Sequence, residues 1–217
     1  MLLEDTGGNS VTIEDNGPGD MNDTIGVIVF DGTLGGDTTW TINVATGLSK
    51  PILGPDADMD LNSVNVATDG PGTLRISLTD TDYTSVANTS FGVQFEIGGT
   101  NSSQGILLAQ FWGDDSNSEF GMSELLGTLG PFGDGAFSDT GNAVWSSQDG
   151  VFSLTQRITL VHNASGRSSF NVNLTALGNP DLQEIVPEPA SMSIMFLGTL
   201  LAGFGLRRRK ENQIGLN

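Results

Sequence analysis

The chain has 217 residues, of which 30 are glycine, and it is 37% hydrophobic and only 16% charged, with a formal net charge of −18 at pH 7. This length suits one sizeable domain plus a tail. The glycine content and low charge exclude a long helical bundle, and the hydrophobic content excludes a fully disordered chain. Because there is no cysteine, a disulfide framework, a thiolate metal site and a cysteine nucleophile are excluded.

The charge is distributed unevenly along the chain. Residues 1–186 hold 24 acidic residues against four basic ones, a net charge of −20, whereas residues 187–217 hold two acidic against four basic ones, a net charge of +2. A domain this acidic repels phosphate backbones and anionic polymers, and it attracts cations. We therefore expect no nucleic-acid partner.

Short segments in which apolar and polar residues alternate predict half-buried β-strands. In a clear example, Leu74, Ile76 and Leu78 share one face and Arg75 and Ser77 share the other. About eight to ten strands are expected. In chain order, the segments with this character are 11–13, 25–30, 40–44, 74–78, 91–97, 106–112, 152–160 and 170–174.

Dipeptides that supply positive φ angles stand between these segments and predict tight turns. Together with the strands they favour an all-β fold over residues 1–177, an antiparallel β-sandwich or a jelly roll. Segments 113–118 and 130–150 have the composition of surface loops, and 119–129 is expected to be a loop or strand. The turn dipeptides are Asn16-Gly17, Asp31-Gly32, Asp69-Gly70, Gly98-Gly99, Asp149-Gly150 and Ser165-Gly166.

One acidic run has the spacing of a calcium loop. Four oxygen-bearing side chains alternate there, as in the first half of such a loop, but the turn glycine and the closing bidentate glutamate are missing. In a strand the same residues would share one face, with Met59 and Leu61 opposite and a bulge near 62–63. A solvated acidic face is the favoured interpretation, and a calcium site is the alternative. The candidate ligands are Asp56, Asp58, Asp60 and Asn62.

Candidate catalytic groups are few. His162 is the single histidine, and no local sequence brings a serine and an aspartate to it. Asp80 with Asp82, and Asp114 with Asp115, could be carboxylate pairs of a glycosidase, but that chemistry requires a particular separation in space. We therefore expect no enzymatic activity. A sugar-binding module stays open as an alternative.

Residues 178–186 break the strand pattern and predict a linker before a C-terminal segment of three parts. The first is the extended hexapeptide Val186–Ser191, in which two prolines disfavour helix. The second is an uncharged run that predicts a transmembrane helix over about 190–206. Counted from Pro189 the run spans roughly 27 Å, against a hydrocarbon core of ~30 Å. The third is the basic cluster 207–210, which the positive-inside rule keeps in the cytoplasm, so that the acidic domain lies outside. Residues 211–217 form a short tail.

This order of parts resembles the PEP-CTERM sorting signal of exported proteins of Gram-negative bacteria. The resemblance covers residues 186–210 and implies that exosortase, a membrane transpeptidase, recognises and processes the chain. It implies a sorting motif of Val186, Pro187, Glu188, Pro189, Ala190 and Ser191, and a stop-transfer cluster of Arg207, Arg208, Arg209 and Lys210.

The resemblance also implies export, first with transient anchoring in the inner membrane and then to the cell surface or an extracellular biofilm matrix. Such proteins carry an N-terminal secretory signal, and the acidic opening Met1–Asp5 does not fit one. We expect that signal upstream of Met1. The function expected is that of an exopolysaccharide-associated protein without a cofactor, and the alternative is a carbohydrate- or calcium-binding module at the cell surface.

Overall fold

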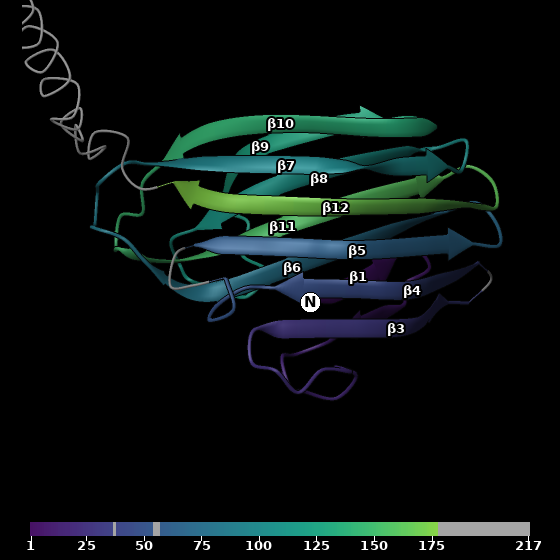
Figure 1. Cartoon of the computed structure of the whole chain (residues 1–217), viewed down its shortest axis with the longest axis horizontal. Helices are drawn as coiled ribbons and strands as arrows, with labels where there is room; N and C mark the ends of the chain where they lie inside the picture. Colours follow the sequence, from purple (N-terminus) through teal and green to yellow (C-terminus); the bar gives the residue numbers. More distant parts are fainter. Residues whose placement is uncertain (37, 54–56, 178–217) are drawn as a thin grey trace, which may run out of the picture. The chain divides into compact units, whose positions relative to one another are not determined.

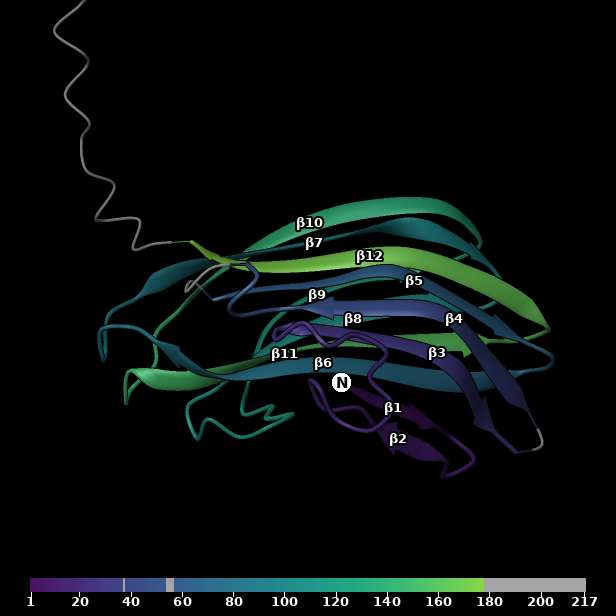
Figure 2. The same cartoon turned by 60° about the horizontal axis from the view of Figure 1, so that its bottom comes forward.

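The computed structural model describes residues 1–36, 38–53 and 57–177, and this part is all-β. Two antiparallel sheets of six strands each lie one above the other, as the side view in Figure 2 shows. The predicted all-β class and antiparallel sandwich are thus confirmed. The chain divides into the units Met1–Pro180 and Asp181–Asn217, and the predicted linker, helix and basic cluster lie outside the described residues.

The first sheet, called sheet A, has the strand order β2-β1-β6-β11-β8-β9. Its centre is formed by the two long strands β6 and β11, which pair along nearly their whole length. The strands of sheet A are β1 (Leu2–Asp5), β2 (Ser10–Thr12), β6 (Gly72–Thr84), β8 (Ile106–Asp114), β9 (Glu124–Phe132) and β11 (Val151–His162).

The second sheet, called sheet B, has the order β10-β7-β12-β5-β4-β3 and faces the viewer in Figure 1. From β5 to β8 and from β9 to β12 successive strands alternate between the two sheets, so the turns there are corners that join the layers. The strands of sheet B are β3 (Val27–Gly35), β4 (Thr39–Leu48), β5 (Asp58–Thr68), β7 (Phe91–Ser102), β10 (Gly135–Trp145) and β12 (Gly166–Leu177).

The core lies between the sheets, and the residues buried in it include those that the alternation of apolar and polar residues predicts. Leu74, Ile76 and Leu78 of β6 are buried, and so are the alternating apolar residues at 91–97 of β7 and 170–174 of β12. Phe95 of sheet B stacks on Phe111 of sheet A with ring centroids 4.5 Å apart. Such contacts across the layers fix the two sheets relative to each other.

Segment 130–150 was expected to be a loop, and this is wrong, because most of it belongs to strands β9 and β10. Gly141 in this segment and Gly127 just before it have a packing reason to be glycine. A Cβ added to Gly127 would lie 2.1 Å from Cζ of Phe95, and one added to Gly141 would lie 2.2 Å from Cε2 of the same ring. The glycines make room for a buried ring where the edges of the sheets approach, and composition alone cannot distinguish this from a loop.

Two of the predicted turns are also wrong. Asp31-Gly32 lies within β3 beside a bulge, and Gly98-Gly99 lies within β7. Gly99 is needed there because a Cβ would lie 2.2 Å from the carbonyl oxygen of Ser169 on β12. With β1, β5, β9 and β10 added to the eight expected segments, the described part has twelve strands, more than the eight to ten expected.

Candidate functional site

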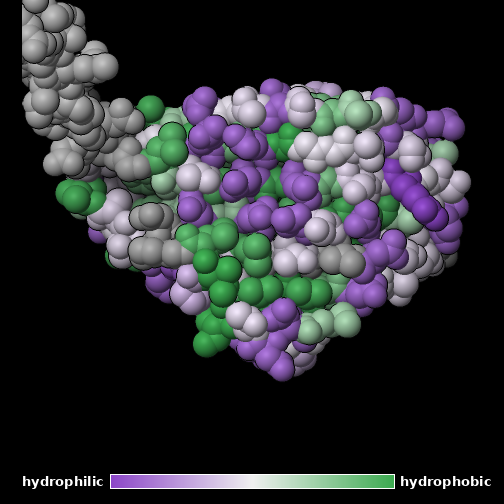
Figure 3. All heavy atoms as spheres, in the orientation of Figure 1, coloured by the Kyte–Doolittle hydropathy of each residue, from purple (hydrophilic) through white to green (hydrophobic). Residues whose placement is uncertain are grey.

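The outside of sheet B carries a polar groove of about 620 Å³, which we call the outer groove. It runs over β10, β7, β12 and β5, where Figure 3 shows hydrophilic residues gathered on this face. A neighbouring area over β3 and β4 is apolar in the same view. The side chains and backbone of Asp60, Glu96, Gly98, Ser138, Thr140 and Asn173 are among those that line the groove.

Strand register sets the side chains of the outer groove in a row. Asn173 of β12 lies between Glu96 of β7 and Asp60 of β5, and Thr140 of β10 stands opposite Glu96. Beyond Asp60 the same row continues to Leu48 of β4. Adjacent strands are about 4.8 Å apart, so donors and acceptors recur at that spacing across the sheet.

The chain itself holds several of these polar groups in place. Nδ2 of Asn62 donates to Oδ2 of Asp60 at 3.4 Å, and Nε2 of Gln94 donates to Oε1 of Glu96 at 3.1 Å. Burial raises the pKa of Asp60, and the hydrogen bond from Asn62 opposes that shift. The carboxylates are therefore oriented, and the outer groove offers acceptors to a ligand.

Of the calcium candidates, Asp60 lines this groove. Met59 and Leu61 are buried, so Asp58 and Asp60 face outward, and the β12 pairing of β5 shifts register opposite Asn62, where the bulge was expected. In the described residues no three carboxylate or histidine groups are arranged to hold a metal ion. Asp56 lies outside the described residues, and calcium binding by this run stays a prediction.

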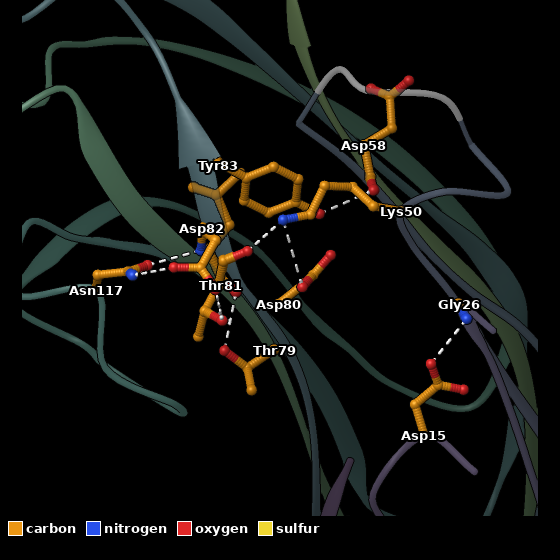
Figure 4. Close-up of polar contacts among 11 residues, drawn as sticks. Asp15, Gly26, Lys50, Asp58, Thr79, Asp80, Thr81, Asp82, Tyr83 and Asn117 are labelled. Carbon is orange, nitrogen blue, oxygen red and sulfur yellow. Dashed lines mark hydrogen bonds and ion pairs between the residues drawn. The ribbon is translucent and has the colours of Figure 1, made fainter.

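A second polar cluster surrounds Lys50 at one end of the sandwich (Figure 4). Its Nζ donates to the carbonyl oxygen of Thr81, lies 3.7 Å from Oδ1 of Asp80 and stands 4.2 Å from the ring centroid of Tyr83. The hydroxyl of Tyr83 donates to the carbonyl oxygen of Asp58 at 3.1 Å, and burial raises the pKa of Tyr83. Lys50 therefore fastens the loop before β5 to β6 with several contacts at once.

Hydrogen bonds between side chains and backbone also hold the neighbouring loops in place. Asp82 has a φ of 58°, and its N–H donates to Oδ1 of Asn117 at 2.8 Å while Nδ2 of Asn117 donates to its Oδ1 at 2.7 Å. Asn117 thereby lowers the pKa of Asp82. Gly26 donates to Oδ2 of Asp15 at 2.8 Å, and its φ of 84° and the nearby Lys50 carbonyl exclude a side chain there. A small cavity of about 180 Å³ lies beside these groups.

The carboxylate pairs considered for a glycosidase do not share a cleft. Asp80 lines the cavity beside Lys50, whereas Asp82 is paired with Asn117 outside it. Asp114 is buried and accepts hydrogen bonds from Ser116 and Ser118, and Asp115 accepts one from the N–H of Gln148 at 3.1 Å. These carboxylates orient turns, which is the common role of aspartate in loops.

His162 contacts a serine as the histidine of a catalytic dyad does, but its hydrogen bond to that serine runs in the opposite direction. Its Nε2 lies 2.9 Å from Oγ of Ser168, and that hydroxyl donates to Oδ1 of Asn101 at 2.9 Å. Nε2 must therefore donate to Ser168, whereas a general base accepts the serine proton. His162 and Ser168 are 1% and 2% exposed, so no substrate can reach them. Burial lowers the pKa of His162 to about 4.

The tryptophans do not form a sugar-stacking platform beside the outer groove. Trp40 is in the core, as its strand pattern predicted, and Trp145 is buried with its Nε1 donating to Oε2 of Glu124 at 2.9 Å. Trp112 lies half-buried on β8 and pairs with Thr155 of β11 in sheet A. No tryptophan is among the described residues that line the outer groove.

Sequence reasoning did not find the outer groove. The alternation at 91–97 and 170–174 placed Glu96 and Asn173 on outward faces, which is where they are. Glu96 and Asn173 are aligned with Asp60 only because β7, β12 and β5 are neighbours in a fixed register. A single sequence does not reveal that order, because these strands are far apart along the chain.

A family model for the PEP-CTERM protein-sorting motif matches residues 186–210. The match has the bounds expected from the three-part pattern and confirms the resemblance. Such a motif implies export, a surface or extracellular location, and exosortase as the processing partner. Among the described residues, no helix is long and apolar enough to cross a membrane.

No curated protein matches the chain. Among solved structures, the chain is similar to TmCBM61 in complex with beta-1,4-galactotriose, with 9% identity, 63% of this chain and 88% of that chain covered, and a TM-score of 0.36. It is also similar to the family 11 carbohydrate-binding module of the cellulase Lic26A-Cel5E of Clostridium thermocellum, with 11% identity, 76% and 96% coverage, and a TM-score of 0.28. Similarities this weak transfer neither a ligand nor a binding site.

Proposed function

We propose that this chain, which carries a PEP-CTERM sorting motif at residues 186–210, is a non-enzymatic β-sandwich protein that exosortase delivers to the cell surface or to an exopolysaccharide matrix. The motif is the observation that supports this most directly. Transient anchoring by a helix over about 190–206, with 207–210 in the cytoplasm, precedes processing. Pro187, Glu188 and Pro189 act as recognition residues of a substrate and perform no chemistry themselves.

The chemistry of the domain is consistent with such a location. Residues 1–186 carry −20, so the domain stays soluble and resists association with other polyanions. It folds without disulfides around a continuous apolar core, so it does not depend on the redox state of its compartment.

The test is a triple substitution in the motif, Pro187→Ala, Glu188→Ala and Pro189→Ala, in the full-length chain expressed in a host with exosortase. We expect the wild type at the cell surface or in the medium, and the variant in the inner membrane with its tail retained. The control is the same triple substitution in a host without exosortase, where the two proteins should fractionate alike. Equal surface delivery of wild type and variant in the exosortase host would refute the proposal.

A second candidate function is binding of carbohydrate or calcium by the same domain at the surface. The outer groove favours it, because its volume lies within the range of small-ligand sites and its polar groups can orient a bound ligand. Calorimetric titration of the full-length chain with calcium alone tests the metal part. Saturable heat that Asp60→Asn abolishes would support calcium, and absence of heat would leave only carbohydrate.

A further inference from the structure

We infer that the outer groove binds a neutral, hydroxyl-rich saccharide chain directly, without a metal ion. This rests on the proposed surface location only for its biological setting, since the groove belongs to the domain itself. The inference depends on three features: the charge of the lining, a glycine in the floor of the groove, and the row of polar groups across the strands.

The charge of the lining selects the class of ligand. Asp60 and Glu96 contribute outward-facing carboxylates, and no lysine or arginine lines the described groove. An anionic sugar would be repelled by these groups and find no cation to pair with. An apolar ligand would leave them desolvated and unpaired, which costs more than it gains. A neutral polyol can donate hydroxyl protons to them.

Gly98 in the floor of the groove has no packing reason to be glycine. Its φ is not in the left-handed region, and an added Cβ would have only the Phe137 carbonyl oxygen at 3.8 Å and Cβ of Ser138 at 3.9 Å as near neighbours. Glycine in a strand interior costs about 0.5–1 kcal/mol relative to alanine. Its neighbour Gly99, in contrast, is required by the backbone of β12. A glycine inside a strand marks a bulge, a tight bend, or close approach by a ligand or another backbone. The pairing of β7 with β10 and β12 is regular at Gly98 and no other backbone is close enough to require glycine, so approach by a ligand is the reason we infer.

The row of side chains fits an extended ligand. From Thr140 through Glu96, Asn173 and Asp60 to Leu48 it crosses five strands in register, roughly 19 Å at about 4.8 Å per strand. This is several times the size of one sugar ring. Asn173 supplies both a donor and an acceptor between two carboxylates, so hydroxyl groups in either role find a partner. The apolar end at Leu48 suits the C–H face of a ring.

The test compares two substitutions of the same kind on the same face of β7. Gly98→Val fills the floor of the outer groove, whereas Gly92→Val lies six residues away, outside it, where a Cβ has ordinary contact with Leu177 at 3.4 Å. Each full-length variant is titrated with dextran, galactomannan and mixed-linkage β-glucan as neutral probes and with polygalacturonate as the anionic probe. Parallel titrations contain a calcium chelator.

We expect saturable binding of wild type to at least one neutral polysaccharide, unchanged by the chelator, and none to polygalacturonate. Gly98→Val should weaken it at least tenfold without lowering the unfolding midpoint, and Gly92→Val should bind as wild type does. Failure of wild type to bind any neutral probe, loss of binding with the chelator, or wild-type binding by Gly98→Val would each overturn the inference. Surface delivery is measured separately, so failure here leaves the sorting proposal standing.

Discussion

The single histidine makes the stability of this domain depend on pH in a calculable way. His162 is buried beside Trp40, with ring centroids 4.9 Å apart, and its Nδ1 has no hydrogen-bond partner in the described part of the chain. A proton added in the folded state would go to Nδ1 and be buried without an acceptor. Burial therefore lowers the pKa of His162 to about 4, although Asp134 opposes the shift.

The sign and size of the effect follow from linkage. In the unfolded chain histidine titrates near its ordinary pKa of about 6.5, so between pH 6.5 and 4 the unfolded state binds a proton that the folded state refuses. The contribution of neutral His162 to the free energy of unfolding is fully present above pH 6.5. It is lost progressively as the pH is lowered through this window. Between pH 7 and pH 5 the loss is about 2 kcal/mol, from ~1.4 kcal/mol per pH unit.

The assay is urea unfolding of the wild type and of His162→Gln at pH 7 and pH 5. Glutamine keeps a donor toward Ser168 but does not titrate. Burial also lowers the pKa of the Met1 amine to about 6, and that contribution is common to both proteins. We expect the wild type to lose about 2 kcal/mol more than the variant. Equal losses in the two proteins would refute the assignment of a buried, neutral His162.

Two further predictions concern the contacts of the loops and edges. Gly127→Ala should lower the free energy of unfolding by about 1–3 kcal/mol, because the added Cβ would overlap the Phe95 ring. Gly133→Ala should be neutral, because nothing lies within 4 Å of the added Cβ. Thermal unfolding measures both variants, and equal midpoints would contradict the packing. Asn117→Asp places a second carboxylate against Asp82 and should lower the thermal unfolding midpoint at pH 7. The difference from the wild-type midpoint should shrink as the pH falls toward 4, because the carboxylates become protonated. A difference that does not change with pH would argue against the pairing.

The parts of the fold that follow from local alternation were predictable. Leu74, Ile76 and Leu78, and likewise the alternating apolar residues of β7 and β12, are buried because period-two patterns place them on one face regardless of what they pack against. The bulge of β5 was visible for the same reason, since the apolar phase changes between Leu61 and Val64.

Other parts depend on contacts that no local pattern carries. Gly99 and Gly141 are glycines because residues of other strands approach them closely, whereas composition alone predicts a turn at 98–99 and a loop over 130–150. The outer groove depends on the neighbour order of β7, β12 and β5. The carboxylates considered for catalysis illustrate the converse, since Asp80 and Asp82 are only two residues apart in sequence and yet have different partners in space.

Removal of the C-terminal segment is the central step of the proposed delivery. The intact mass of the surface-exposed protein shows directly whether that segment has been removed. The protein is released from washed cells of a host that contains exosortase and analysed together with its C-terminal peptide. We predict a chain that ends near the motif at 186–191 and lacks the apolar run and basic cluster up to residue 210. A surface protein that still ends at Asn217, or one found only in the cytoplasm, would contradict the account.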